Sequence, residues 1–507
     1  MGRVPADDSP LEPSEVLARG SSLNLAGRGV GQTAQLVAQI VIARVFGPAA
    51  FGLFGLGWTA FRILSFLAPV GVEHGVVKFG SAYGRSDPGQ VWGIARACGW
   101  VAAVSSAVMA SALFLLAPWL AGTIDQPGLI GLLRAFSVGL PLAALLRVGV
   151  AATRVSQRMG YSVAAEYLLQ PLSFLGLVGI VAVAGGTVVG AAWAATVSFG
   201  LGAALGWYHA RGLFASPGET TNEVDIGLGK IVAFSLPVAL AAAAGIAMPW
   251  LDRLVLAYFV SALDLGVYHA ASQLALGLTL VTAAIGAMLA PMVADLHSRG
   301  DIKALNRVFR LSVRWGVYLA LAPALVLIVL PGPALEALFG PVFGAGEMAL
   351  IILTVGHFLT VATGAPGFVL VMVGRPRAWL FLSAMGVGMN VALNLILIPA
   401  LGLTGAAIAT SVSVMTLFGL TLAVLRREEG LWPYSVANLW VALPGSIIAG
   451  ALWLGSQVVW PTWPSWRTLL AGSGMAVALL GLCLVFAAPT RDDRALVGRI
   501  LGREQHT

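Results

Sequence analysis

The sequence GAAWAAT at residues 190–196 is followed 215 residues later by GAAIAT at residues 405–410. A second pair of similar stretches has almost the same separation: FGLFGLG from Phe51 and LGVYHAA from Leu265, which aligns Gly52 with Gly266. Two similarities at one separation, close to half of the 507 residues, indicate an internal duplication. Duplicated halves in a membrane protein are typical of transporters whose substrate site lies between the repeats.

The composition identifies lipid as the solvent. The chain is 58% hydrophobic and 10% charged, with a mean hydropathy of +0.90, which is too apolar for a soluble protein of this length. We therefore predict an all-α polytopic membrane protein with about fourteen spans of about 20 residues each. The predicted spans are centred near Gln35, Leu64, Met109, Ala143, Gly176, Ser198, Leu240, Leu278, Ala320, Val361, Val387, Val412, Gly450 and Leu479.

Basic residues predict the orientation. With the N-terminus inside, most of the 29 Lys and Arg residues fall in or beside cytoplasmic segments, and Arg253 and Arg467 are the clearest external ones. The positive-inside rule then places both termini in the cytoplasm, as expected for a multi-pass protein of the cytoplasmic membrane. The basic charge thus has a topological cause, and we expect no nucleic-acid partner.

The repeat contains about six spans. Because six is even, both halves enter the membrane in the same direction, and we expect two six-helix lobes related by a pseudo-two-fold axis along the membrane normal. Two C-terminal spans lie outside the repeat. The predicted boundaries are a cytosolic leader 1–20, an N-lobe 21–212, a cytoplasmic linker 213–229, a C-lobe 230–428, two extra spans 429–490 and a cytosolic tail 491–507.

The sequence offers no support for catalysis. The loops are too short to build an extramembrane catalytic domain, and we find no nucleotide-binding loop, zinc-protease motif or nucleophile elbow. Cys98 and Cys483 both fall in predicted spans, so we expect no disulfide and no metal cluster. The leader has no apolar core, so we do not expect a cleaved signal peptide. We expect a protein that is not an enzyme and needs no cofactor.

Arginines inside predicted spans are the first candidates for a site. A charge in hydrocarbon costs roughly 2.5 to 3.5 kcal/mol, so such side chains usually face water or a partner. Arg62 lies roughly 16 Å deep, near the bilayer centre, where snorkelling to a headgroup is difficult. For Arg28, Arg44 and Arg134, which are shallower, snorkelling is an equal alternative.

The first span carries a polar stripe. Its five members recur at spacings of three or four and therefore share one helical face: Asn24, Arg28, Gln32, Gln35 and Gln39. Hydrogen bonding between helices is the alternative, but five polar groups exceed what packing needs. We therefore interpret the stripe as the wall of a water-filled cavity.

Other polar residues fall in later spans. Glu166 is a candidate proton or cation carrier, or else a structural counter-ion for Arg154 or Arg158. Asn390 and Asn394 repeat the stripe pattern in the eleventh span. His357 could relay protons, although a hydrogen-bonded core histidine is the commoner role. Asp252 and Arg253, at the outer end of the seventh span, could form a gate, a substrate clamp or a simple interfacial pair.

Six stretches of the chain follow one another in the order found in a known family: ARVFGPAAFGLFGLG from Ala43, DRLVLAYFVSALDLGVYHAASQLA from Asp252, APMVADLHSRGD from Ala290, LFGPVFGAGEMAL from Leu338, MVGRPR from Met372 and NVALNLILIPALGLTGAAIATS from Asn390. In these stretches the chain resembles the polysaccharide flippases (Wzx-type translocases of lipid-linked oligosaccharides) of the multidrug/oligosaccharidyl-lipid/polysaccharide exporter superfamily.

This resemblance implies a substrate of undecaprenyl pyrophosphate carrying an oligosaccharide, moved to the outer leaflet by alternating access. Arginine binds phosphate through a planar fork, so we expect Arg28 and Arg62, with Arg253 and Arg134 as further candidates, to neutralise the pyrophosphate in a cavity between the lobes. The polar stripes would meet the sugars. Membrane lipid, a polysaccharide polymerase and glycosyltransferases are the expected partners of a monomeric transporter.

Three alternatives remain at this point. A flippase for lipid II, the peptidoglycan precursor, would share the fold and the pyrophosphate chemistry. A multidrug/cation antiporter of the same superfamily would prefer an acidic cavity and twelve spans. A membrane glycosyltransferase would need a sizeable outer loop with paired carboxylates, which the sequence does not contain.

Overall fold

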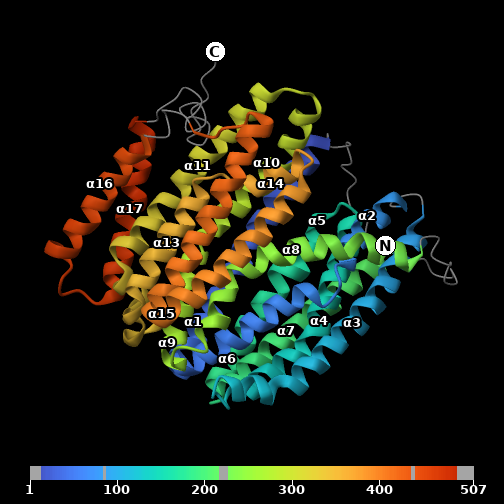
Figure 1. Cartoon of the computed structure of the whole chain (residues 1–507), viewed down its shortest axis with the longest axis horizontal. Coiled ribbons are helices and arrows are strands. Elements are labelled where there is room, and N and C mark those ends of the chain that lie inside the picture. The colour runs from blue at the N-terminus through green and yellow to red at the C-terminus, as the bar shows by residue number, and fades with distance from the viewer. Residues whose placement is uncertain (1–12, 84–86, 216–226, 435–439, 488–507) are drawn as a thin grey trace, which may run out of the picture. The chain divides into compact units, whose positions relative to one another are not determined.

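The structure is a computed structural model that describes residues 13–83, 87–215, 227–434 and 440–487 (Figure 1). The described residues form helices joined by short connections, with no strand among them. The predicted C-terminal tail, most of the predicted leader and the middle of the predicted linker lie outside the described residues. The all-α fold class predicted from composition is confirmed.

The number of spans agrees with the prediction. Eleven described helical segments are long and apolar enough to cross a membrane. Two of them, Leu23–Tyr83 and Pro376–Glu429, each carry two predicted spans, and helix α8 (Leu228–Leu256) supplies the remaining one. Of the fourteen predicted centres, only Leu278 lies outside a helix, at the break between α9 and α10.

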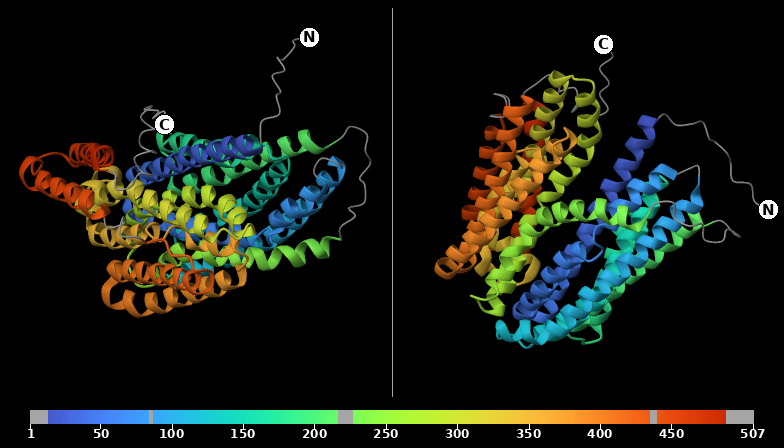
Figure 2. Two further views of the ribbon diagram at one scale, coloured as in Figure 1. Left: turned by 90° about the horizontal axis from the view of Figure 1, so that it is seen from above. Right: turned by 45° about the vertical axis from the view of Figure 1, so that its right-hand side comes forward.

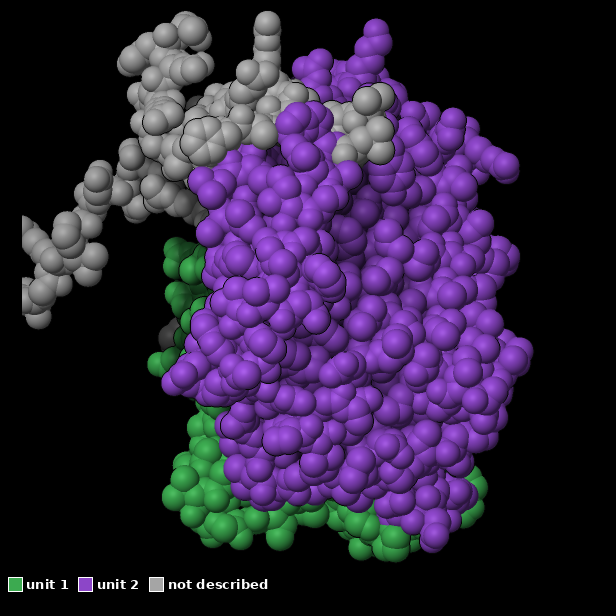
Figure 3. Space-filling view, turned by 90° about the vertical axis from the view of Figure 1, so that its left-hand side faces the viewer, with its two compact units in different colours: residues 1–39, 60–121, 127–243 green, residues 40–59, 122–126, 244–507 purple. Residues whose placement is uncertain are grey.

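The chain divides into two compact units, coloured separately in Figure 3. Unit 1 comprises residues 1–39, 60–121 and 127–243, and unit 2 comprises residues 40–59, 122–126 and 244–507. The predicted lobe boundaries at 212 and 230 stay predictions. The compact units instead divide within α8 and assign a short N-terminal segment to unit 2.

Unit 1 is built from the ends of α1, the start of α8 and the helices between them. Its elements are α1 (Pro13–Leu67, shared with unit 2), α2 (Val72–Tyr83), α3 (Pro88–Thr123), α4 (Leu129–Val155), α5 (Met159–Val163), the π-helical turn η1 (Ala164–Leu169), α6 (Gln170–Val183) and α7 (Val188–Phe214). Helices α4 and α7 pack along each other at its centre.

Unit 2 contains the end of α8 and all later helices. Its elements are α9 (Ala262–Leu276), α10 (Thr279–Ser298), α11 (Ile302–Val329), α12 (Pro331–Phe339), the 3₁₀ turn η2 (Pro341–Gly346), α13 (Glu347–Val361), α14 (Pro366–Met372), α15 (Pro376–Glu429), α16 (Ala442–Leu454), the π-helical turn η4 (Gly455–Val459) and α17 (Ser465–Ala487). Helices α16 and α17, the pair outside the repeat, pack against α11 at one edge of unit 2 (Figure 2).

Two long helices are broken at glycines. Gly47 in α1 has φ 82° and Gly402 in α15 has φ 55°, both in a region that side chains other than glycine rarely adopt. Pro48 follows the first break and Pro399 precedes the second. Each break separates two spans that the sequence predicts.

The duplication is visible in the packing inside each unit. In unit 1 the Thr196 hydroxyl of α7 donates to the carbonyl of Ala135 on α4 at 2.8 Å. In unit 2 Ser411, 215 residues after Thr196, donates to the carbonyl of Ile352 on α13 at 3.0 Å. A glycine faces each hydroxyl, Gly139 in unit 1 and Gly356 in unit 2. Equivalent helix pairs therefore use the same contact.

The second repeated stretch meets its own copy. Within unit 2, a Cβ placed on Gly52 of α1 would lie 2.1 Å from the carbonyl oxygen of Ala262, and one on Gly266 of α9 would lie 2.0 Å from that of Pro48. The two equivalent glycines thus face each other reciprocally, as expected at a two-fold contact. Arg44, further back on α1, donates from Nε to the carbonyl of Leu338 at 2.7 Å, at the end of α12. These contacts hold residues 40–59 in unit 2.

We predict that Gly266→Ala lowers the thermal unfolding midpoint, because the new methyl group would overlap a backbone carbonyl. Overpacking of this kind costs about 1 to 3 kcal/mol. The matched control is Gly176→Ala in α6, where a Cβ meets nothing within 4 Å and alanine favours the helix. Thermal unfolding of the purified protein in detergent measures both, and equal midpoints for the two variants would contradict the close crossing.

Candidate functional site

Arg62 lies in unit 1 beside a second half-buried arginine, Arg147. Phe61 is buried against Phe136 and Phe199, with ring centroids 5.4 and 5.0 Å away. That contact fixes the orientation of the helix and leaves the next residue, Arg62, half-buried. The guanidinium of Arg62 lies 5.7 Å from the Phe66 ring centre, and that of Arg147 on α4 lies 3.5 Å from the same ring. Two positive charges therefore share one aromatic neighbour.

Two carboxylates offset part of this charge. Glu73 of α2 lies 3.6 Å from the guanidinium of Arg147. Glu166 accepts a hydrogen bond from Arg154 at 2.6 Å. In the described structure, Arg62 Nε and Glu73 Oε2 are buried without a hydrogen-bond partner. Glu166 therefore makes the ion pair with Arg154 that its structural alternative requires.

Arg28 of α1 joins the same group through Tyr167. Its guanidinium lies 5.6 Å from the Tyr167 ring centre, and Tyr167 is within electrostatic range of Glu166 and Arg154. Glu166 and Tyr167 both lie on η1, a wide helical turn of a kind frequent at functional sites. Because a π turn contains more residues per turn than an α-helix, the side chains of Glu166 and Tyr167 point in directions that differ from those in a regular helix.

We call these six side chains the arginine cluster: Arg28, Arg62, Arg147, Arg154, Glu73 and Glu166. With all six ionised, four positive and two negative charges leave a net charge of +2. The cluster is not sealed, because the side chains of Arg147, Arg154 and Glu166 are 25%, 37% and 33% exposed. An excess of positive charge that a ligand can reach is suited to binding an anion with two negative charges.

The polar stripe borders this cluster on α1. Gly27 and Gly31 face the neighbouring helices, and a Cβ on Gly31 would lie 2.3 Å from the carbonyl oxygen of Tyr167. The stripe lies beside this packed face: Gln32 is exposed, Asn24, Arg28 and Gln35 are half-buried, and Gln39 is buried. Within the described ranges, the side chains of Asn24, Gln32 and Gln35 make no hydrogen bond to protein. Their exposure is compatible with contact to water or sugar.

Arg134 lies away from the cluster contacts. It is exposed on α4, with its guanidinium 4.8 Å from the ring centre of Phe114, which is also exposed. This is the arrangement that snorkelling along the lipid-facing surface would give. The structure therefore does not bring Arg134 together with Arg62.

Unit 2 holds a different polar centre, which we call the Asp252 network. Asp252 accepts hydrogen bonds from the Tyr268 hydroxyl at 2.5 Å and from the Thr410 hydroxyl at 3.0 Å. Asn390 donates to Thr410 at 3.3 Å, and Asn394 donates to the Asn390 side-chain oxygen at 3.0 Å. Helices α8 and α9 and both arms of α15 thus contribute to one chain of hydrogen bonds.

The network is closed to solvent. Asp252 is 1% exposed, and Asn390 and Asn394 are fully buried. The side-chain oxygen of Asn394 has no hydrogen-bond partner in the described structure. These positions suit an internal role better than direct contact with a sugar. Oxygen atoms from Asp252, Thr410, Asn390 and Asn394 are also the donor type that small hard cations prefer.

Arg253 and His357 lie beside this network. Arg253 is fully buried, donates to the Ser272 hydroxyl and to the carbonyl of Pro249, and stacks 4.5 Å from the ring centre of Trp250. His357 on α13 is 5% exposed and lies within electrostatic range of Arg253. The Arg253 guanidinium is therefore held by internal partners, unlike the partly exposed arginines of unit 1.

Sequence reasoning missed four partners: Arg147, Glu73, Tyr268 and Thr410. Arg147 was counted only among the basic residues near the cytoplasmic side, and Arg154 was considered only as a possible ion-pair partner of Glu166. Thr410 ends the repeated stretch GAAIAT, so its position was visible without its role. Among the described residues, no three His, Cys, Asp or Glu side chains gather as a set of metal ligands.

Curated relatives match the chain in part. A probable flippase AglR from Haloferax volcanii is 31% identical over 178 residues, which cover 34% of this chain and 37% of that protein. A probable lipid II flippase MurJ from Rhizobium tropici is 27% identical over 228 residues, covering 42% of this chain and 41% of that protein. The chain thus spans about two fifths of the length of the curated relatives it matches.

Solved structures share the fold over most of the chain. The lipid II flippase MurJ in an inward closed conformation aligns with a TM-score of 0.70 and 11% identity, covering 95% of this chain and all of that one. An inward-facing MATE family multidrug transporter of the MOP superfamily aligns with a TM-score of 0.65 and 18% identity, covering 81% and 98%. At these identities the likeness establishes the polytopic helical fold.

A family model supplies the classification. The model described as polysaccharide biosynthesis protein matches residues 17–297, more than half of the chain. The matched range includes all six side chains of the arginine cluster, together with Asp252 and Tyr268 of the Asp252 network. The chain therefore belongs to the polysaccharide biosynthesis protein family.

Proposed function

We propose that this membrane protein is a flippase that moves an undecaprenyl-pyrophosphate-linked oligosaccharide from the inner to the outer leaflet of the cytoplasmic membrane. The observation that carries the proposal is the arginine cluster, whose net charge of +2 matches a pyrophosphate dianion. The family membership supports the same substrate class, as do the relatives named as a probable flippase, a probable lipid II flippase and a probable low-salt glycan biosynthesis flippase.

The roles within the cluster follow from exposure and pairing. Arg62 and Arg147 supply the charge that Glu73 and Glu166 leave unbalanced, and Arg62 Nε is free to donate to a phosphate oxygen. Arg28, on α1, supplies a further guanidinium group that contacts the pyrophosphate. The stripe residues Asn24, Gln32 and Gln35 meet the sugars, and the polyprenyl tail stays in lipid. Arg134 and Arg253, whose contacts lie elsewhere, take no part in binding the pyrophosphate.

A lipid II flippase is the second candidate, because two of the relatives are named as such and because lipid II also carries a pyrophosphate. Rescue of cells depleted of their own lipid II flippase would favour this substrate. Accumulation of lipid-linked oligosaccharide on the cytosolic leaflet of a deletion strain would favour the first. A multidrug antiporter is disfavoured because the partly exposed charge in unit 1 is positive.

We further propose that the Asp252 network couples transport to an ion gradient. Asp252 is a buried carboxylate of α8 that accepts hydrogen bonds from two other helices, α9 and α15, so a change in its charge would alter the contacts among the three helices. We assign His357 to the same coupling, because it is buried on α13 near Arg253, the residue that follows Asp252. Asn390 and Asn394 extend the same chain of hydrogen bonds rather than a sugar site.

Replacing Arg62 with alanine should weaken binding of undecaprenyl pyrophosphate by about 10- to 150-fold, the usual loss for one charged hydrogen bond of about 1.5 to 3 kcal/mol. Surface glycan should disappear while the protein stays in the membrane. Arg467→Ala is the matched control, because Arg467 also stacks on an aromatic ring, Trp466, at 5.1 Å but lies on α17. Full glycan output from the Arg62 variant would defeat the assignment.

Asp252→Asn should abolish the response of transport to an imposed gradient, because the amide keeps the shape of the carboxylate without its charge. Binding of undecaprenyl pyrophosphate should change less than threefold, since the arginine cluster is intact. The measurement is translocation of labelled lipid-linked oligosaccharide in proteoliposomes under a Na⁺ gradient, a pH gradient or neither. Asp264→Asn, at the exposed start of α9, should respond like the unaltered protein. A gradient response that survives in the Asp252 variant rules out this coupling residue.

A further inference from the structure

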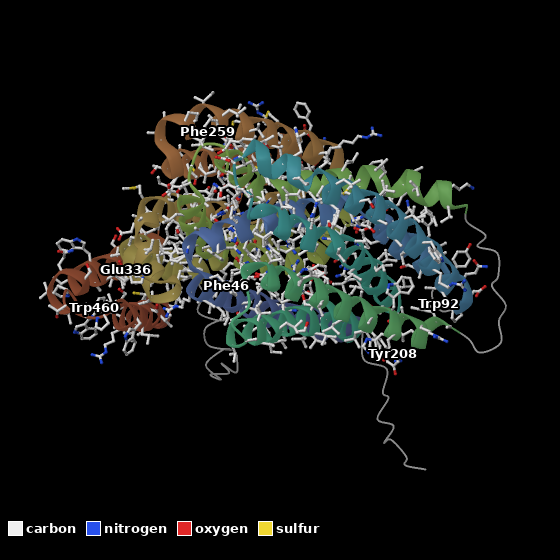
Figure 4. The ribbon with its side chains drawn as sticks, turned by 90° about the horizontal axis from the view of Figure 1, so that it is seen from below. Phe46, Trp92, Tyr208, Phe259, Glu336 and Trp460 are labelled. Carbon is white, nitrogen blue, oxygen red and sulfur yellow. The ribbon has the colours of Figure 1, made fainter. Side chains whose placement is uncertain are left out.

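A basic and aromatic pocket lies at the C-terminal end of α7 in unit 1. It encloses about 550 Å³ and is lined by Trp92 and Arg96 of α3 and by Ala204, Trp207, Tyr208 and Arg211 of α7. Figure 4 shows Trp92 and Tyr208 at the same end of the unit. Arg96, Tyr208 and Arg211 are exposed, and neither arginine has an ion-pair partner in the described part of the chain. Among the described residues that line this Trp207 pocket, none is acidic.

The wall of the Trp207 pocket is fixed. The Trp207 indole donates to the carbonyl of Leu145 at 3.0 Å, and its ring meets that of Trp92 edge to face with centroids 5.9 Å apart. A Cβ on Gly99 would lie 2.7 Å from the Trp207 ring, so glycine at that position admits the indole. These contacts fix the position of the Trp207 ring, so the shape of the pocket is defined by the packing of the unit.

A second pocket of the same character lies at the C-terminal end of α15 in unit 2. It encloses about 460 Å³ and is lined by Gly419, Ala423, Arg426, Arg427 and Trp432. The Arg426 guanidinium lies 4.6 Å from the Trp432 ring centre. The Trp432 backbone is bound on both sides, since its N–H donates to Asn306 at 3.2 Å and its carbonyl accepts from Arg310 at 3.1 Å.

Two acidic residues, Glu428 and Glu429, directly follow Arg427 in the sequence, and both already have an ion-pair partner. Arg375 forms an ion pair with Glu428, and its Nε donates to Glu429 at 2.8 Å. Arg375, which does not line the pocket, offsets one of these two negative charges. Arg426 and Arg427 keep an unbalanced positive charge at its rim.

The two pockets occupy equivalent positions in the duplicated chain. Ala204 and Gly419, Tyr208 and Ala423, and Arg211 and Arg426 are each separated by 215 residues, the separation of the stretches that begin at Gly190 and Gly405. The second arginine differs: α3 supplies Arg96 in unit 1, whereas Arg427 follows Arg426 directly in unit 2. Both halves therefore place one arginine at the same position of the last repeat helix, whereas the second arginine and the aromatic residues of each pocket come from positions that are not equivalent.

We propose that each pocket binds the phosphate headgroup of an anionic phospholipid. Arginine forks suit the phosphate, the tryptophan and tyrosine rings suit the glycerol level of the bilayer, and the apolar side chains of Ala204 and Ala423 in the pocket linings suit the first acyl carbons. A soluble phosphate would make no use of these apolar side chains. In the orientation proposed above, both pockets face the cytoplasmic leaflet. The proposal uses the predicted orientation and does not depend on the cargo assignment.

Native mass spectrometry of the purified protein with phosphatidylglycerol tests this binding. Arg96→Ala with Arg211→Ala should remove one tightly bound lipid, and Arg426→Ala with Arg427→Ala the other, each with an affinity loss of about 30-fold. The matched control replaces Lys303 and Arg307, two exposed basic residues at the start of α11, and should change the affinity less than threefold. Arg211→Lys keeps the charge and should retain the lipid, which separates lost charge from misfolding.

Three results would overturn the proposal. Equal weakening by the Lys303 and Arg307 control would show that only general surface charge is involved. Equal binding of phosphatidylcholine would remove the role of the negative charge. Displacement of the lipid by inorganic phosphate at comparable concentration would assign the pockets to a soluble anion. None of these measurements involves the glycan cargo, so they can fail while the flippase assignment stands, and the reverse is also true.

Discussion

A guanidinium inside a membrane helix must find water, a counter-ion or a ligand, because hydrocarbon solvates none of its five donors. The interior of this protein is arranged around that requirement, and the two units meet it differently. In unit 1, four arginines share two carboxylates and remain partly exposed. In unit 2, Arg253 is sealed among Ser272, Pro249 and Trp250 beside a buried aspartate.

The two units differ in how they accommodate their arginines, although equivalent helices pack alike in both. The hydrogen bonds of Thr196 and Ser411, and the glycines that face them, show that equivalent helices pack alike in each unit. The polar groups on these helices differ: α4 also carries Arg147 and Arg154 of the arginine cluster, whereas α15 carries Thr410 of the Asp252 network directly before Ser411. An open cationic centre suits an anionic cargo, and a closed acidic one suits a small ion, so duplication followed by divergence can separate binding from coupling.

The sequence predicted that arginines lie inside the membrane region, but it identified only some of the residues that surround them. Arg28, Arg62 and Glu166 were recognised because each is a charge within an apolar window, the strongest local signal available. Arg147 lies only four residues from the predicted span centre at Ala143 and was missed because it was counted among the cytoplasmic basic residues, whereas Glu73 was missed because it lies near the end of its predicted span. Asn390 and Asn394 were recognised by spacing, yet helical periodicity reports only a shared face. It cannot say whether that face meets water or, as here, Thr410 and Asp252.

Apolar windows, turn glycines and the repeat determined the helical class, the number of spans and the breaks at Gly47 and Gly402, because these depend on local hydropathy and backbone freedom. Only the tertiary structure decided which charges are paired, which are sealed and which stay open to a ligand. Those outcomes depend on residues hundreds of positions apart, such as Asp252 and Thr410, whose contact distance no local pattern encodes.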